Sequence, residues 1–294
     1  MTHVSLRSSR TISPGTPYLP ANSRQSTREI PPVPARPRRL SVGKGLSYGW
    51  VFGPLVLLAV WSLGSALDWI DPRILPAPWV AVTTGARLAA EGRLLPNIAV
   101  SAGRVGSGLA VGILAGLLLA LFSGLTRLGG YLIDGVVQIK RAVPIYALIP
   151  FFTLWFGIGE GMKIAVIAVA TFYPVYLQTH NALRTIDLRY VELAESLRLS
   201  YRDFLRHIVL PGVLPGFLMG LRFSVMTAWL SVIIVEQTNA TRGIGYMVTL
   251  AVSYAQTDVM LVGLVLYAAL GVVSDTLIRL LQRGLLSWQR TLAA

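Results

Sequence analysis

Cysteine is absent from the 294 residues, and charged side chains make up only 13% of them. Without cysteine the chain forms no disulfide and offers no thiolate to a metal. The three histidines, His3, His180 and His207, have no metal-ligand spacing. The sequence also lacks GxxxxGKS or GxxxxGKT, the phosphate-binding loop of ATPases, and GxSxG, the nucleophile motif of many hydrolases. We therefore expect no cofactor, no metal and no catalytic residue.

Apolar residues dominate what is present. They form 54% of the chain, and the mean hydropathy is +0.62, which is typical of a membrane protein. The net charge of +13 would suggest nucleic acid in a soluble protein. Here the basic residues flank apolar runs, so we expect membrane lipid as a partner and no nucleic acid.

Six segments approach the length of about 20 residues that a helix needs to cross the hydrocarbon layer. Buried helices of a soluble protein are the alternative, but such helices rarely run this long without a polar stripe. The sequence therefore predicts an all-α polytopic membrane protein with about six transmembrane helices. The predicted spans cover residues 50–68, 98–124, 130–158, 162–183, 212–236 and 258–281.

Residues 1–46 differ in composition from the rest of the chain. They are rich in Pro, Ser and Arg and contain a single acid, Glu29, so they have too few apolar residues to form a core. We expect a disordered, basic cytoplasmic tail, with a transit peptide or a signal built on Arg38 and Arg39 as alternatives. Residues 47–290 then form the transmembrane domain.

The basic residues also predict the orientation. With both termini in the cytoplasm, 17 of the 26 Lys and Arg residues fall in cytoplasmic segments, and only Arg73, Arg87, Arg93 and Arg242 fall in outer segments. This asymmetry is the positive-inside pattern of multi-pass proteins. Residues 184–211 are therefore predicted to be a cytoplasmic loop, while residues 71–96 form an outer cap.

The second predicted span carries a row of small residues. Gly108, Gly112 and Gly116 recur at intervals of four and place one face of the helix close to a neighbouring backbone. The stretch GRVGSG at residues 103–108 superficially suggests nucleotide binding. No strand precedes it, however, so we assign this stretch to helix packing.

Proline and basic residues mark the third predicted span. Pro144 and Pro150 should bend or break the helix, and broken helices at membrane depth often line a transport pathway. Lys140 and Arg141 lie in its approach. They either favour an anion in that pathway or reach back to lipid headgroups.

Two charged residues of the fifth predicted span need partners elsewhere. Arg222 and Glu236 are 14 residues apart, about 21 Å along one helix, so they cannot pair with each other. We treat both as candidate pathway residues. For Arg222 a structural role is the alternative.

The loop at residues 184–211 contains signals for two short helices. Ser200 followed by Asp203 predicts a helix that restarts at about Tyr201 and stops before Pro211. An earlier helix, residues 189–197, would place Val191, Ala194 and Leu197 on one side and glutamates on another. Such a loop is either simply solvated or a docking element, and the helical spacing of its apolar residues favours docking.

This loop resembles the EAA loop of ATP-binding-cassette (ABC) importer permeases. Glu192 and Ala194 match the first and third positions of that motif, and Ile208, Leu210 and Pro211 match its last block. Arg198 occupies the usual glycine position, so we expect a wider bend between the helices, because arginine is strained at positive φ. The residues expected to couple the chain to an ATPase are Glu192, Ala194, Arg198, Ser200, Asp203, Ile208, Leu210 and Pro211. We call residues 184–211 the coupling loop.

The resemblance extends over residues 50–288 and is greatest to the aliphatic-sulfonate, taurine and nitrate permeases. It implies a MetI-like permease fold in a bacterial inner membrane, a homodimer, two cytoplasmic ATPase subunits and an extracytoplasmic binding protein. The substrate implied is a small anion, an aliphatic sulfonate first, with taurine, nitrate or a thiamine precursor as alternatives. A channel or stand-alone transporter would need no coupling loop, and a membrane enzyme would need a reactive constellation that the sequence lacks.

Overall fold

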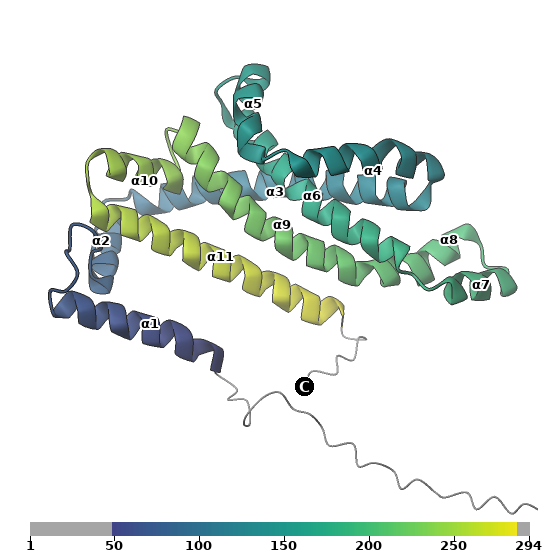
Figure 1. Cartoon of the computed structure of the whole chain (residues 1–294), viewed down its shortest axis with the longest axis horizontal. Coiled ribbons are helices and arrows are strands. Elements are labelled where there is room, and N and C mark those ends of the chain that lie inside the picture. Colours follow the sequence, from purple (N-terminus) through teal and green to yellow (C-terminus); the bar gives the residue numbers. More distant parts are fainter. Residues whose placement is uncertain (1–48, 287–294) are drawn as a thin grey trace, which may run out of the picture. The chain divides into compact units, whose positions relative to one another are not determined.

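The computed structural model describes residues 49–286, in which every regular element is a helix and no β-strand occurs (Figure 1). The predicted all-α fold is therefore confirmed for these residues, while the predicted tail, residues 1–46, lies outside them. In chain order the helices are α1 (Gly49–Ala66), α2 (Pro78–Ala90), α3 (Leu94–Leu125), α4 (Arg127–Ala142), η1 (Ile145–Leu148), α5 (Ile149–Phe156), α6 (Glu160–Arg184), α7 (Leu188–Ser196), α8 (Tyr201–Phe204), η2 (Leu205–Val209), α9 (Leu210–Asn239), α10 (Ile244–Ser253) and α11 (Thr257–Leu285).

Four helices are long and apolar enough to cross a membrane. They are α3, α6, α11 and the helix Tyr201–Asn239, which joins α8, η2 and α9. Each overlaps one predicted span, and the first predicted span overlaps the shorter apolar helix Val51–Ala66. The lengths and compositions are those of a multi-pass membrane protein.

The third predicted span is divided. α4 ends at Ala142, and Pro144 is extended before η1 and α5. Because proline has no N–H and its ring collides with the preceding turn, the helix breaks here as expected. Pro150 does not break a helix. It lies in the first turn of α5, where its missing N–H removes no helical hydrogen bond.

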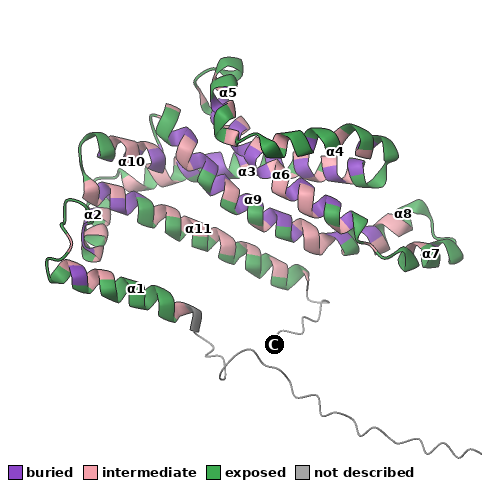
Figure 2. Ribbon diagram, viewed as in Figure 1, coloured by how far each residue is buried: buried purple, intermediate pink, exposed green. Residues whose placement is uncertain are grey.

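The core lies where α3, α6 and α9 meet. Figure 2 shows buried residues concentrated along α6 and α9. The largest apolar cluster joins Val105 of α3, Ile167 of α6 and Val232 of α9. These helices form the frame from which the other elements extend.

Glycines on α3 allow α6 to approach its backbone. A Cβ at Gly108 would lie 2.5 Å from a methyl carbon of Ile167, and one at Gly116 would lie 2.5 Å from the Phe172 carbonyl oxygen. At Gly112 a Cβ would overlap the Thr171 hydroxyl and lie 2.7 Å from the Ala168 carbonyl oxygen. This is the close contact that the four-residue spacing predicts, and it gains dispersion energy that lipid tails would not supply.

Replacing Gly112 with alanine is expected to destabilise the chain by about 1–3 kcal/mol, because the new methyl group meets backbone that cannot move aside. Gly106 is the matched control on the same helix, since a Cβ there meets no described atom within 4 Å. Alanine at Gly106 should leave stability unchanged or raise it slightly. Thermal unfolding of the full chain in detergent measures both variants. Equal unfolding midpoints would contradict the close packing.

Candidate functional site

The predicted coupling loop forms two short helices, α7 and α8, at one end of the helical bundle (Figure 1). We call this the loop end. α7 begins after Asp187, whose carboxylate accepts a hydrogen bond of 2.9 Å from the Arg189 amide. The side chain of Asp187 thus satisfies one of the amides that a helix start leaves unpaired.

α7 ends in a tight left-handed turn at Arg198. The φ angle of Arg198 is 50°, and its amide donates to the Glu195 carbonyl at 3.0 Å. The Leu199 amide donates to the Ala194 carbonyl, also at 3.0 Å, which completes a Schellman turn. The expected wider bend is therefore wrong. The backbone keeps the conformation that glycine favours, at a steric cost of about 1–2 kcal/mol for arginine.

Ser200 starts the second helix. Its hydroxyl accepts a hydrogen bond of 3.2 Å from the Asp203 amide and donates one of 2.6 Å to the Asp203 carboxylate. α8 accordingly begins at Tyr201, as the sequence predicts. Ala194 of α7 is buried and lines a small cavity with Phe204 of α8. The Schellman turn and the Ser200 cap thus define the connection between the two helices.

The remaining surface of the coupling loop is exposed and mixes charged with apolar side chains. Glu192 is exposed, as are Leu188 and Leu193. Leu197 was expected to lie on the same side as Ala194, but 62% of its surface is exposed. Leu197 therefore adds to the free surface. Exposed leucines beside charges are typical of a protein-binding surface, and docking here stays a prediction.

The second helix does not stop before Pro211, contrary to the sequence prediction. η2 is a π-helical segment, and the Leu210 amide at its end donates to the Leu205 carbonyl five residues back. Pro211 follows in the first turn of α9, directly after this wide turn. The helix therefore continues from Tyr201 to Asn239 over 39 residues.

The last block of the motif lies at the root of the coupling loop. Ile208 and Pro211 line a cavity of about 430 Å³ with Asp187 and Tyr190. Leu210 points outward and is exposed. Ile208 and Pro211 thus lie between the start of α7 and the start of α9.

Glu236 lies at the other end of the same long helix, in a buried ionic network. Its side chain has no exposed surface, and its carboxylate is 2.8 Å from the Arg104 guanidinium of α3. The Ser101 hydroxyl donates to both carboxylate oxygens, at 2.8 and 2.9 Å, and the Gly245 amide donates at 2.8 Å. Every oxygen of this buried carboxylate therefore has donors, which burial of a charge requires.

Arg104 extends the network to the next helix. Its guanidinium forms two hydrogen bonds with Glu160 of α6, at 2.6 and 2.7 Å, and Glu160 also binds Lys163 at 3.0 Å. The sequence predicts no partner for Glu236, which pairs with Arg104 in the structure. The signal that would have joined them is that each is a lone charge inside an apolar run, and such charges pair in membrane proteins.

Arg222 has a partner on α11. Its guanidinium is 2.6 Å from the Asp275 carboxylate, which also binds Arg279 at 2.6 Å. Arg222 and Glu236 do not pair with each other, as their spacing required. The contact with Asp275 satisfies the charge of Arg222 and favours the structural alternative for this residue.

Lys140 and Arg141 remain without a carboxylate partner among the described residues. The Lys140 ammonium lies 5.1 Å from the ring centres of both Phe172 and Tyr173, which are cation–π contacts. Arg141 is exposed. Among the three basic residues predicted as pathway candidates, Lys140 and Arg141 therefore have no acidic partner in the described part of the chain, whereas Arg222 has one.

The described residues contain no group of three His, Asp or Glu side chains that could hold a metal ion. The coupling loop can act as a binding surface. The residues around Glu236 form a fixed ionic junction between four helices, α3, α6, α9 and α10.

Comparison with known proteins identifies related sequences. The family model "Binding-protein-dependent transport system inner membrane component" matches residues 112–287. The chain is 42% identical to a protein of Escherichia coli strain K12 named as an aliphatic sulfonates transport permease, SsuC, over 81% of this chain and 90% of that protein. It is 32% identical to the taurine transport system permease protein TauC of the same strain, over 79% of this chain and 86% of TauC.

A solved structure shares the fold. The crystal structure of an amino acid ABC transporter with histidines superimposes with a TM-score of 0.55 and covers 67% of this chain and 96% of the chain compared. The sequence identity is 13%, so this likeness concerns the fold alone.

Replacing Glu236 with glutamine is expected to destabilise the chain by about 3 kcal/mol. Arg104 then keeps only the carboxylate of Glu160, and the hydrogen bonds that buried donors give to the Glu236 side chain weaken. Arg87→Gln is the matched control. It also removes one member of an ion pair, with Asp258 at 3.0 Å, but Arg87 is 57% exposed, so the loss should be at most about 1 kcal/mol. Thermal unfolding in detergent measures both. Equal losses would show that the Glu236 junction does not hold the helices together.

Proposed function

Because the chain belongs to the family of binding-protein-dependent transport system inner membrane components, we propose that it is the permease subunit of an ABC importer for aliphatic sulfonates. The observation that carries the substrate is the 42% identity to SsuC, which extends over 90% of that protein.

Taurine transport is the second candidate, and it rests on the 32% identity to TauC. Taurine is itself an aminoalkane sulfonate, so both candidates share the sulfonate group and differ in the ammonium group. The two cations without a carboxylate partner, Lys140 and Arg141, suit a sulfonate anion. Together with Pro144 and Pro150 they are our candidates for the pathway. Arg222 and Glu236 take structural positions in this scheme.

The partners follow from the family. We propose a homodimer of this chain in a bacterial inner membrane, with two ATPase subunits that hydrolyse ATP and an extracytoplasmic protein that delivers the substrate. Both termini and the coupling loop would face the cytoplasm, which the distribution of Lys and Arg favours. The chain itself would catalyse no reaction.

The long helix suggests how ATP hydrolysis reaches the pathway. The coupling loop would dock on the ATPase, and its second helix continues without a joint into α9. A helix of 39 residues is about 58 Å long. Closure of the ATPase dimer would therefore move α9 as a rod and shift the helices packed on it, a rigid-body transition. Glu192 is the charged residue of the docking surface that we expect to contribute most to binding of the ATPase.

Uptake measurements test the substrate. The chain, its ATPase and its binding protein, reconstituted in liposomes, are expected to take up labelled ethanesulfonate only with ATP. Unlabelled alkanesulfonates should compete at lower concentration than taurine, because taurine carries an ammonium group that alkanesulfonates lack. Stronger competition by taurine would favour the second candidate. Uptake by the chain alone without ATP would contradict an importer subunit.

Replacing Glu192 with lysine tests the docking surface. Charge reversal at a protein interface costs several kcal/mol, so we expect both ATPase co-purification and ATP-driven uptake to fall by roughly tenfold or more. The side chain is exposed, so the unfolding midpoint should not change. Glu91→Lys is the matched control, an exposed glutamate in the predicted outer cap. Unchanged association and uptake in Glu192→Lys would exclude the proposed coupling.

A further inference from the structure

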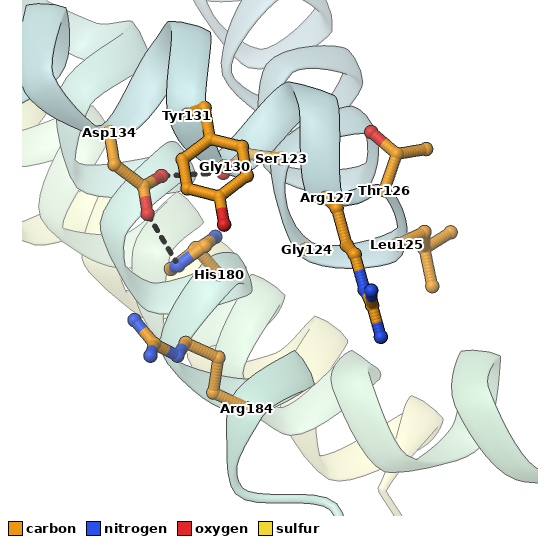
Figure 3. Close-up of a pocket in the computed structure, with 10 residues that line it drawn as sticks. All are labelled: Ser123, Gly124, Leu125, Thr126, Arg127, Gly130, Tyr131, Asp134, His180 and Arg184. Atoms are coloured by element: carbon orange, nitrogen blue, oxygen red, sulfur yellow. Dashed lines mark hydrogen bonds and ion pairs between the residues drawn. The ribbon is translucent and has the colours of Figure 1, made fainter.

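A polar cavity of about 540 Å³ opens at the loop end, between the α3–α4 turn and the last turns of α6 (Figure 3). Its ten lining residues include Ser123, Arg127, Asp134, His180 and Arg184. In Figure 3 Arg127 comes from α4 and lies on one side of this opening, while Arg184 comes from α6 and extends along the other side, below His180 and Asp134. None of these residues belongs to the Glu236 junction, and only Arg184, the first residue of the coupling loop, belongs to that loop.

One oxygen of the carboxylate in this cavity is engaged by hydroxyl groups. Asp134 accepts hydrogen bonds from Ser123 at 2.5 Å and Tyr176 at 2.6 Å, both at Oδ1, and its Oδ2 lies 3.8 Å from the His180 ring nitrogen Nε2. These contacts tie α3, α4 and α6 together. The single negative charge of Asp134 offsets part of the charge of the two arginines and leaves the lining with an excess of one positive charge.

Two groups in the cavity, the guanidinium groups of Arg127 and Arg184, remain available to a ligand, while His180 is buried. Neither Arg127 nor Arg184 forms an ion pair with a described carboxylate, and both are exposed. His180 is 8% exposed, and its Nδ1 has no hydrogen-bond partner in the described part of the chain. The net charge of the lining, two arginines against one engaged aspartate, favours an anion.

An apolar groove of about 320 Å³ lies next to this cavity and shares Leu125 with it. Figure 3 shows Leu125 beside Arg127, on the side away from His180. All nine residues that line the groove are apolar: Leu117, Leu121, Leu125, Leu205, Val209, Leu210, Val213, Leu214 and Phe217. The groove thus lies between α3 and the π-helical start of α9.

We infer that this pair of cavities binds one anionic phospholipid, with its phosphate at Arg127 and Arg184 and one acyl chain in the apolar groove. Basic pockets beside transmembrane helices are suited to anionic headgroups, and a groove lined only by apolar side chains suits a hydrocarbon chain. A soluble anion would fill the polar cavity and leave the groove empty. The lipid accounts for both cavities and for their common wall at Leu125.

The bound lipid has a mechanical consequence. Its acyl chain would contact Leu205 and Val209 of η2, the segment that joins the coupling loop to α9. Its headgroup would contact the start of α4. Anionic lipid would therefore brace the coupling helix against α3 and α4. This inference requires only that the chain spans a membrane, so it does not depend on the proposed substrate or partners.

Lipid retention measured by native mass spectrometry tests the site. The full chain is extracted from nanodiscs that contain equal amounts of phosphatidylglycerol and phosphatidylcholine. We expect phosphatidylglycerol to be retained selectively by the wild type. The double variant Arg127→Gln, Arg184→Gln should bind it about thirtyfold more weakly, since each basic residue near an anionic lipid contributes about 1 kcal/mol. The double variant Arg73→Gln, Arg93→Gln, which removes two exposed arginines of the predicted outer cap, is the control and should retain the lipid.

A second variant and a competition experiment address the groove. Leu121→Trp, which fills the groove and leaves both arginines in place, should also reduce retention. Ethanesulfonate in solution should not displace the lipid from the wild type. Equal retention of the two lipids by the wild type, unchanged retention in the arginine variant, or displacement by ethanesulfonate would each overturn the proposal. Because lipid retention is measured without ATP or transport, the result is independent of the proposed function.

Discussion

The uninterrupted helix from Tyr201 to Asn239 is the constraint on which the rest of the structure depends. It begins in the coupling loop and carries Glu236 three residues before its end. Two prolines, Pro211 and Pro215, lie within this 39-residue helix, where proline normally kinks or ends a helix. The π-helical segment before Pro211 widens the turn, with the Leu210 amide donating to the Leu205 carbonyl, and the helix continues past both prolines. One continuous helix therefore joins the coupling loop to the Glu236 junction.

A rod transmits movement only if its neighbours hold it at defined points. The Thr171 carbonyl of α6 accepts a hydrogen bond of 2.6 Å from Ser224 in the middle of α9. A Cβ at Gly220 of α9 would lie 2.9 Å from the Pro174 carbonyl oxygen of α6, so glycine at this position lets the two backbones approach closely. At the far end the Glu236 carboxylate fixes the rod to α3 and α10. Toward the loop end the packing is apolar, with Val209 and Val213 against Leu183 of α6. Movement would therefore begin at the loop and meet its greatest resistance at the ionic junction.

Sequence patterns within a few residues predict much of this fold. They do not predict contacts between residues that are far apart in the chain. The four-residue spacing of Gly108, Gly112 and Gly116 depends only on helical geometry, and so does the cap formed by Ser200. The pairing of Glu236 with Arg104 joins residues 132 positions apart, and no local pattern encodes such a pair. Pro211 was misread for a related reason: the rule for proline is local, but the π-helical segment that accommodates it is packed against Leu183 of α6 and depends on that contact.

The turn at Arg198 shows which interaction sets the shape of the coupling loop. If the left-handed conformation depended on glycine, arginine at this position would open the turn, and it does not. Two backbone hydrogen bonds of the Schellman type form there, each worth about 1 kcal/mol. Ala194 is also buried and lines a small cavity with Phe204 of the second helix. Together these interactions offset the strain of about 1–2 kcal/mol. The angle between the two helices is therefore fixed by backbone hydrogen bonds and apolar contact, and the residue in the turn is free to present its charge to a partner.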